Sequence, residues 1–338
     1  MEHETDLIAS AETADDPGRG RHATEPTEIP ARGWKDILAR VRIEVKRDRV
    51  ALLSAAVAFH ALLALVPALV ALVSLYGLIA DPSSIDRQVN DWLGTAPREV
   101  RELLASQLKS ITEDAGAATG LAVVIGIVFA LWTSSSGIAH LIAATNIAYD
   151  EEETRGFVAR RGLALALTAG AVVFTLFALV VITVLPAILA DTGLSVSARV
   201  LVGSLRWVLL IVGMMLALAV LYRYAPDRDH PQWTWTSPGA MVATVLWVIA
   251  SAGFALYTAN FGKYNETYGS LGAVVVLMLW LFFTVLCVIV GAELNAELER
   301  QTREDTTQGA PMPLGSRDAE VADTVGATAE ELHATDKA

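Results

Sequence analysis

Residues 268–299, YGSLGAVVVLMLWLFFTVLCVIVGAELNAELE, decide the fold class of this 338-residue chain. Residues 268–292 carry no charged side chain, and Glu293, Asn295 and Glu297 then come in close succession. About 20 apolar residues in a helix are enough to cross the roughly 30 Å of hydrocarbon in a bilayer. The stretch therefore predicts a transmembrane helix over 268–292, whose polar end leaves the membrane at Glu293.

Five other segments have the same continuous apolar character. Of the whole chain, 54% is hydrophobic and only 18% is charged, whereas soluble domains average about 25% charged residues. The six predicted spans cover, roughly, residues 50–80, 120–142, 162–190, 200–222, 238–259 and 268–292. We therefore expect an all-α fold, namely a polytopic membrane protein with six transmembrane helices.

Basic residues near the span ends predict the orientation, because Lys and Arg gather on the cytoplasmic side of a membrane. The basic residues concerned are Arg40, Arg42, Lys46, Arg47 and Arg49 before the first span, and Arg155, Arg160 and Arg161 between the second and third. The opposite side holds Arg87, Arg98, Arg101 and Lys109, spread over one long loop, and then Arg199 and Lys263. Both termini are therefore expected in the cytoplasm, and the chain is expected in the plasma (inner) membrane.

Two regions outside the spans also show helical spacing. In residues 33–49, apolar side chains recur at Trp34, Ile37, Leu38, Val41 and Val45, which predicts an amphipathic helix lying in the membrane interface. The loop over residues 81–119 contains two shorter stretches of the same kind. They predict short external helices that cover the bundle.

Both ends of the chain are acidic. Residues 1–30 hold eight acidic and two basic side chains, and residues 301–338 hold eight and three, so the tails contribute −6 and −5 to the net charge of −12. The tails lack apolar periodicity and bury too little surface to offset the entropy of ordering. Residues 1–32 and 301–338 are therefore predicted to be disordered. Acidic tails also repel phosphate backbones, so we expect no nucleic-acid partner.

The common sequence motifs of catalysis are absent. The chain has no Walker A loop, no His-Glu-x-x-His pair and no nucleophile elbow. Its one cysteine, Cys287, lies in an apolar run, where packing is its expected role. We expect no enzyme, no catalytic residue, no cofactor, no metal and no transport powered directly by ATP.

Polar side chains in or beside the spans are the remaining candidates, because they are costly in lipid. His60 lies in the first span, either as a proton relay or substrate contact, or as a neutral imidazole bonded to a neighbour. Glu293 and Asn295 end the last span, either at the mouth of a cavity or on a solvated helix end. The sequence leaves these alternatives open.

Residues 131–155, LWTSSSGIAHLIAATNIAYDEEETR, continue the second span with a polar stripe. At 100° per residue, the residues on one face are Trp132, Ser135, Ser136, Ala139, Ala143, Asn146 and Asp150, whereas Tyr149 lies on the other. A stripe of small and polar side chains suits close packing against another helix as well as it suits a water-filled cavity.

Four ordered motifs resemble the YihY/BrkB family of bacterial inner-membrane proteins. They are AAVAFHALLALVPALVAL in the first span, the stretch 131–155, LYRYAPDR after the fourth span, and the stretch 268–299. Matching positions include Trp132, Ser135, Asn146, Tyr149, Tyr268, Glu293 and Asn295, whereas the family pattern has an aromatic residue, usually Tyr, in place of His60. The resemblance implies six spans with both ends inside.

Members of that family have been labelled ribonuclease BN, virulence factor or transporter. The ribonuclease label finds no support in these residues, because the sequence shows neither a metal constellation nor a basic soluble surface for RNA. The family resemblance therefore supplies an architecture and leaves the activity open.

The sequence is compatible with two hypotheses of function. The first is a transporter or lipid-handling protein that does not use ATP, with membrane lipids as partners and a lipid or small molecule as substrate. Its candidate residues, on a substrate path or in a polar interior, are His60, Trp132, Ser135, Ser136, Asn146, Tyr149, Tyr268, Glu293 and Asn295. The second is a structural or assembly protein of the cell envelope. The sequence leaves the oligomeric state open.

Overall fold

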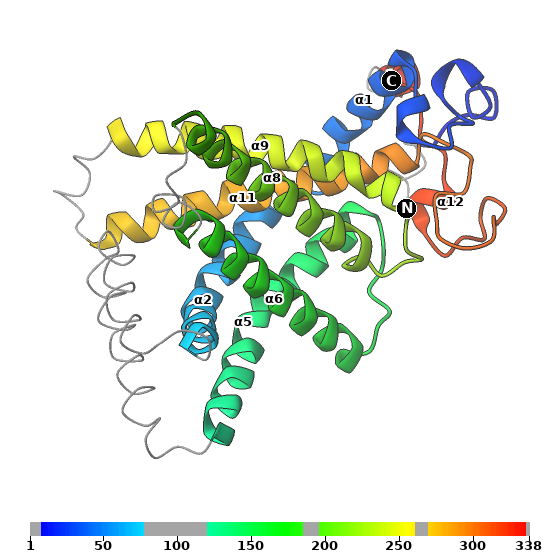
Figure 1. Ribbon diagram of the computed structural model, residues 1–338. Coiled ribbons are helices and arrows are strands. Elements are labelled where there is room, and N and C mark those ends of the chain that lie inside the picture. The colour runs from blue at the N-terminus through cyan, green and yellow to red at the C-terminus, as the bar shows by residue number, and fades with distance from the viewer. Residues whose placement is uncertain (1–7, 78–119, 185–195, 261–269, 336–338) are drawn as a thin grey trace.

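The computed structural model describes residues 8–77, 120–184, 196–260 and 270–335 (Figure 1). The long helices are α1 (Ala31–Arg47), α2 (Val50–Gly77), α5 (Gly120–Ala148), α6 (Phe157–Leu179), α8 (Val196–Tyr224), α9 (Trp233–Asn260) and α11 (Ser270–Glu299). Shorter helical segments are η2 (Pro17–Arg19), η3 (Pro26–Glu28), the π-turn η5 (Val180–Val184), α12 (Glu320–Asp323) and α13 (Ala329–Thr335). The described chain forms two isolated β-bridges besides these helices, which confirms the all-α prediction.

The membrane prediction is also confirmed in outline. Five described helices are by themselves long and apolar enough to cross a bilayer, and α1 with α2, which meet at a 60° bend, make a sixth candidate. The predicted external helices over 81–119, and the predicted span ends at 78–80, 185–190 and 268–269, lie outside the described residues.

Several helices extend past the predicted span ends. Helix α9 begins at Trp233 rather than 238, and α5 continues to Ala148 rather than 142. Hydropathy marks where a segment becomes polar, whereas a helix continues as long as its polar side chains have partners. In α9 this places Pro238 inside the helix, where the Ser237 hydroxyl donates to the carbonyl of Trp233 at 2.6 Å.

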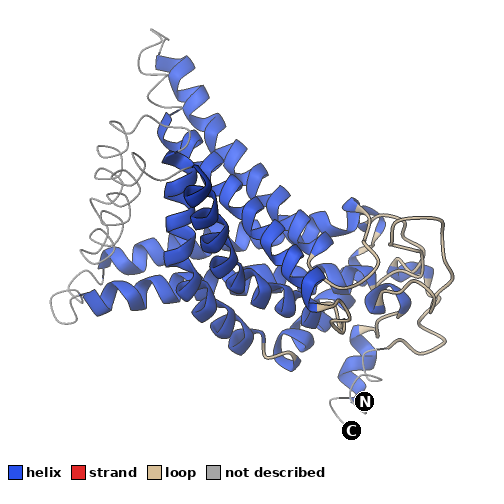
Figure 2. Cartoon of the chain, turned by 90° about the horizontal axis from the view of Figure 1, so that it is seen from below, coloured by secondary structure: helices blue, strands red, loops and turns tan. Residues whose placement is uncertain are grey.

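Helix α11 lies at the centre of the bundle. It packs against α9 and α2, and also against α1 and α5, while α8 packs on α9 and α6 on α5. The shared core is built from residues such as Val57, Ile142, Tyr222, Ala243 and Ile289. Away from the two tails the helices fan apart, as Figure 2 shows.

Two glycines let α9 and α11 cross closely. A Cβ added at Gly239 would lie 2.5 Å from the side-chain carbon Cγ of Asn295, and one added at Gly291 would lie 2.7 Å from the Cβ of Ala243. The hydroxyl of Tyr222 occupies the same crossing and donates to the carbonyl of Val288 at 2.7 Å. Backbone approach at small residues is a principal source of helix association in membranes.

The tails differ from the prediction of disorder, because residues 8–30 and 301–335 fold together around α1. The amide of Ala9 donates to the carbonyl of Val325 at 2.8 Å, which joins the two tails directly. Buried arginines support them: Arg21 donates to the carbonyls of Thr13, Gln301 and Gly326. The prediction counted only apolar surface, whereas these segments are ordered by guanidinium-to-carbonyl hydrogen bonds. We call this end of the bundle the tail end.

Replacing Gly291 by Leu tests the α9–α11 crossing. The new side chain meets backbone and Tyr222, so we expect a loss of at least about 2 kcal/mol of stability, as overpacked cores show. The matched control is Gly170→Leu on α6, where an added Cβ meets nothing within 4 Å. Thermal unfolding of the detergent-purified variants measures the difference, and equal unfolding midpoints would show that the crossing is not tightly packed.

Candidate functional site

Five carboxyl groups gather where α11 reaches the tail end. They belong to Glu44 of α1, Asp48 in the α1–α2 turn, Asp150 after α5, and Glu293 and Glu297 of α11, and we call them the carboxyl cluster. Glu44, Glu293 and Glu297 are each exposed by 2% or less. The interpretation of Glu293 as a solvated helix end is therefore wrong, because its side chain is only 1% exposed.

Two buried arginines neutralise part of this cluster. Arg300 donates to Asp150 at 2.6 Å and to Glu297 at 3.1 Å, and it lies 3.7 Å from Glu44. Arg40 forms a fully buried ion pair with Glu297. Both arginines thus pair with Glu297, and Arg300 also pairs with Asp150. In contrast, one oxygen each of Glu293 and Glu44 has no hydrogen-bond partner in the described chain.

The backbone around the cluster is locally unusual. Arg49, in the turn between α1 and α2, has φ +50°, and Asp150, just after α5, has φ +53°. Non-glycine residues adopt this left-handed region rarely, and at a cost of order 1 kcal/mol or more. The turn at Asp150 is held by the ion pair with Arg300, and both turns carry a carboxyl group of the cluster, Asp48 or Asp150.

The amphipathic helix α1 forms as predicted, but its polar face is buried. Asp36, Arg40 and Glu44 are exposed by 2% or less, while Leu38 on another face is 58% exposed. Arg40 donates its remaining hydrogen bonds to the side chain of Gln301 and to carbonyls of α11 and the C-terminal segment. Sequence spacing identified the apolar stripe of α1, whereas the partners of Arg40 on its polar stripe lie more than 250 residues away in the chain.

A second buried ion pair lies beside Tyr149. Arg228 makes two hydrogen bonds to Glu299, at 3.2 and 2.7 Å, and its guanidinium lies 5.3 Å from the centre of the Tyr149 ring. The side chain of Tyr149 is fully buried, and burial raises the pKa of its hydroxyl above the usual value. Tyr149 therefore packs against the buried Arg228–Glu299 ion pair and is not exposed to a solute.

The two candidate asparagines connect chain segments. Asn295 donates to the carbonyl of Thr236 at 3.1 Å and accepts from the amide of Gly239 at 2.7 Å, so it ties α11 to α9. Asn146 accepts from the amide of Asp227 at 2.9 Å and donates to Glu153 at 3.0 Å. Both side-chain amides are thus engaged within the protein, as donor and as acceptor.

The polar stripe of α5 is used mainly inside its own helix. The hydroxyls of Ser135 and Ser136 donate to the carbonyls of Trp132 and Thr133, at 2.8 and 2.9 Å. An added Cβ at Gly137 would lie 3.3 Å from Ala64 of α2. These contacts favour the packing interpretation of the stripe. Trp132 itself is 44% exposed and carries the guanidinium of Arg161 at 4.3 Å from its ring centre.

His60 has a partner that its own sequence context does not predict. Its ring stacks on that of His140 of α5, with the centroids 3.5 Å apart and the planes within 8°. The Nδ1 atom of His140 lies 2.7 Å from the carbonyl oxygen of Ser136. Nothing in the sequence pairs two residues of different helices, so only the packing of α2 on α5 reveals the contact. Tyr268 lies outside the described residues.

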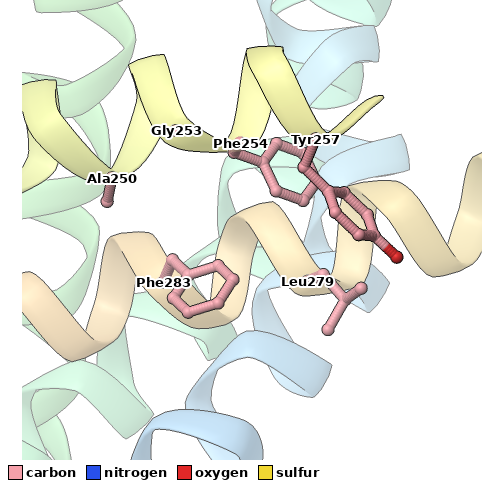
Figure 3. A pocket seen from close by; sticks show the side chains of 6 residues that line it. All are labelled: Ala250, Gly253, Phe254, Tyr257, Leu279 and Phe283. Carbon is pink, nitrogen blue, oxygen red and sulfur yellow. The ribbon is translucent and has the colours of Figure 1, made fainter. Parts of the chain in front are cut away.

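An apolar groove of about 410 Å³ lies between α9 and α11 (Figure 3). Its lining residues are Ala250, Gly253, Phe254, Tyr257, Leu279 and Phe283. The ring centroids of Phe254 and Phe283 are 6.3 Å apart, so each helix contributes an aromatic ring to the lining of the groove. The groove was not predicted from the sequence, because the apolar residues that line it cannot be distinguished there from the other apolar residues of a predicted span.

Comparison with known proteins gives matches over most of the chain. Residues 42–314 match the model of the family described as "Virulence factor BrkB". The Bacillus subtilis (strain 168) protein described as "Putative ribonuclease-like protein YfkH" is 31% identical over 261 residues, which make up 74% of this chain and 90% of that protein. No solved structure matches the chain.

Two relatives match over shorter regions. A "UPF0761 membrane protein" of Tolumonas auensis is 35% identical over 92 residues, which are 27% of this chain and 30% of the relative. One from Vibrio cholerae serotype O1 (strain ATCC 39315 / El Tor Inaba N16961) is 32% identical over 118 residues, or 34% of this chain and 39% of the relative. The printed names of both relatives describe membrane proteins.

The substitution Arg40→Ala tests whether the buried ion pair holds the tail end together. Removing one partner leaves Glu297 buried with less compensation, and such losses typically cost about 3–5 kcal/mol. Arg42→Ala is the matched control, because Arg42 is exposed on the same helix. We expect Arg40→Ala to lower the thermal unfolding midpoint well below that of Arg42→Ala. Indistinguishable midpoints would contradict the assignment.

Proposed function

This chain belongs to the BrkB family of membrane proteins, and on that premise we propose that it handles membrane lipids. In this proposal an acyl chain binds in the groove between α9 and α11, and the protein positions or moves the lipid without using ATP. The function is one of binding and transfer rather than of bond-breaking chemistry.

The groove is the observation that carries this proposal. Its volume of about 410 Å³ falls in the roughly 300–1,000 Å³ typical of ligand sites, which are lined mainly by apolar and aromatic groups. Tyr257, Leu279 and Phe283 remain 44%, 36% and 37% exposed, so the groove opens on the outside of the helix pair. Both helices are candidate membrane spans. An opening on such helices faces acyl chains rather than water.

The occupant fits the chemistry of the lining. The groove offers aromatic faces, a leucine side chain and, at Gly253, open space where another residue would place a Cβ. A hydrocarbon chain gains about 0.8 kcal/mol for each CH₂ buried against water, but in a membrane it gains mainly from shape and packing. A groove between aromatic rings therefore suits a flexible chain whose headgroup remains in the interface.

A water-soluble substrate is less well supported. The hydroxyls of Ser135 and Ser136 and the amides of Asn146 and Asn295 bond to protein groups rather than to an open interior. At the tail end, the described ion pairs of Arg40, Arg228 and Arg300 link the helices to one another. These hydroxyls, amides and guanidinium groups are thus engaged in holding the bundle together.

An envelope-assembly role remains the second candidate, and one observation favours it. The folded tails form an ordered surface at the tail end, on which the acidic side chains of Asp15, Glu304 and Glu330 are exposed. Such a surface suits docking to another protein. RNA cleavage is not part of either proposal, because the net charge of −12 repels phosphate backbones.

The substitution Gly253→Leu tests acyl-chain binding by filling the groove. The full chain is reconstituted in nanodiscs with a phospholipid that carries a photoreactive group on its acyl chain, and the labelled residues are mapped by mass spectrometry. We expect labelling of Phe254, Leu279 or Phe283 in the wild type. The leucine side chain fills space that the acyl chain would occupy, so we expect labelling to fall about tenfold, which corresponds to a loss of about 1.4 kcal/mol in binding free energy.

The control for this experiment is Gly170→Leu on α6, which adds the same side chain at another exposed helix position. It should leave labelling of the groove unchanged. Equal labelling of the wild type and Gly253→Leu would reject the groove as a lipid site and favour the assembly role.

A further inference from the structure

Glu293 differs from the other buried acids of the carboxyl cluster in having no cationic partner among the described residues. Its side chain is 1% exposed, and its Oε1 atom has no hydrogen-bond partner in the described chain. Glu297, one turn further along α11, is paired with both Arg40 and Arg300. A buried carboxylate without a partner is strongly disfavoured unless it is neutralised.

The group that faces Glu293 is another acid. The carboxyl of Asp48, in the α1–α2 turn, lies within hydrogen-bonding reach of the Glu293 carboxyl. Ionised carboxylates only accept hydrogen bonds, so two of them cannot bond to each other. The contact becomes favourable when one of the two carries a proton, as in other carboxyl pairs.

No nearby cation is left to neutralise the two carboxyl groups in place of a proton. The titratable and charged groups near the pair are Arg40, Glu44 and Arg47 on α1, Tyr149 and Asp150 just after α5, Glu297 on α11 and Arg300 just after it. The two buried arginines are committed to Glu297 and Asp150, and Arg47 lies 3.3 Å from Glu44. The described residues therefore leave the local balance negative at Glu293 and Asp48.

We propose that Glu293 and Asp48 form a proton-binding site, in which Glu293 carries the proton and donates it in a hydrogen bond to the Asp48 carboxylate. The proton ties the α1–α2 turn to the end of α11. Its loss leaves two facing carboxylates that repel each other and loosen that tie. The site does not depend on the proposed lipid binding, although Glu293 and the groove residue Phe283 share α11, about 15 Å apart along its axis.

The titration of Asp48 agrees with this geometry. Burial, together with the nearby Asp150, raises the pKa of Asp48 to about 6 from its ordinary value of 3.8. At pH 7 Asp48 is therefore ionised and accepts the hydrogen bond from Glu293, and the proton that Asp48 takes up below about pH 6 is a second one. Because the folded pKa is the higher one, the folded chain binds this second proton more tightly than the unfolded chain. The resulting stabilisation is complete below about pH 4 and is lost as the pH rises to about 6.

Infrared spectroscopy of the full-length protein tests the proposal, because a protonated carboxyl has a C=O stretching band distinct from those of carboxylates. Burial raises the pKa of Glu44 to about 8, so Glu44 also contributes to this band at pH 7. The wild type should show the band, and the difference spectrum between wild type and Glu293→Gln should isolate the component that Glu293 contributes. Glu152→Gln, which removes an exposed carboxylate near the cluster, should keep it. A wild-type spectrum identical to that of Glu293→Gln would overturn the proposal.

A second variant covers the case in which Glu293→Gln does not fold. Asp48→Asn changes the acceptor of the proton, so the carboxyl band of Glu293 should persist but shift in frequency. An unshifted band would show that Glu293 is protonated without sharing its proton with Asp48, which contradicts the proposed site.

Thermal unfolding in Na⁺ and in choline buffers provides a further check. An unfolding midpoint that rises with Na⁺, with no protonated band present, would assign the carboxyl cluster to a metal cation instead.

Discussion

The buried ion pair between Arg40 and Glu297 is the interaction on which the tail end depends. It joins α1 to the last long helix, and the same guanidinium also donates to the carbonyl of Ala327 in the C-terminal segment. Charges removed from water require partners for nearly every donor and acceptor. The tails are ordered because they supply those partners, with Arg21 and Arg317 doing the same for neighbouring carbonyls.

The two ends of α11 differ in their surroundings. At the tail end its polar residues bind α1, α9 and the turns after α1 and α5 into one network, where Glu293 is the described acid left without a cation. Toward the other end its apolar residues line an open groove with α9. A single continuous helix thus connects a buried titratable group to a surface that suits acyl chains, and this connection joins the two proposals.

Continuous hydrophobicity could be read from the sequence, whereas the pairing of distant side chains could not. Apolar runs located the membrane helices, and the cost of polar groups in lipid singled out His60, Glu293 and Asn295. Their partners, His140, Asp48 and Thr236, lie on other elements, and no local pattern marks them. The tails were predicted to be disordered because they lack apolar periodicity. The bonds from arginine to backbone carbonyls that order them leave no such pattern in the sequence. The groove lies between α9 and α11, two helices that the sequence does not pair and that approach closely at Gly239 and Gly291.

The central claim is that α9 and α11 form a lipid site, and a structure determined by electron cryo-microscopy in lipid nanodiscs tests it most directly. We predict elongated density for an acyl chain along Phe254 and Phe283, with its headgroup at the membrane interface beyond Tyr257. A groove filled by protein side chains, or one with no lipid density while lipids are ordered elsewhere on the bundle, would contradict it.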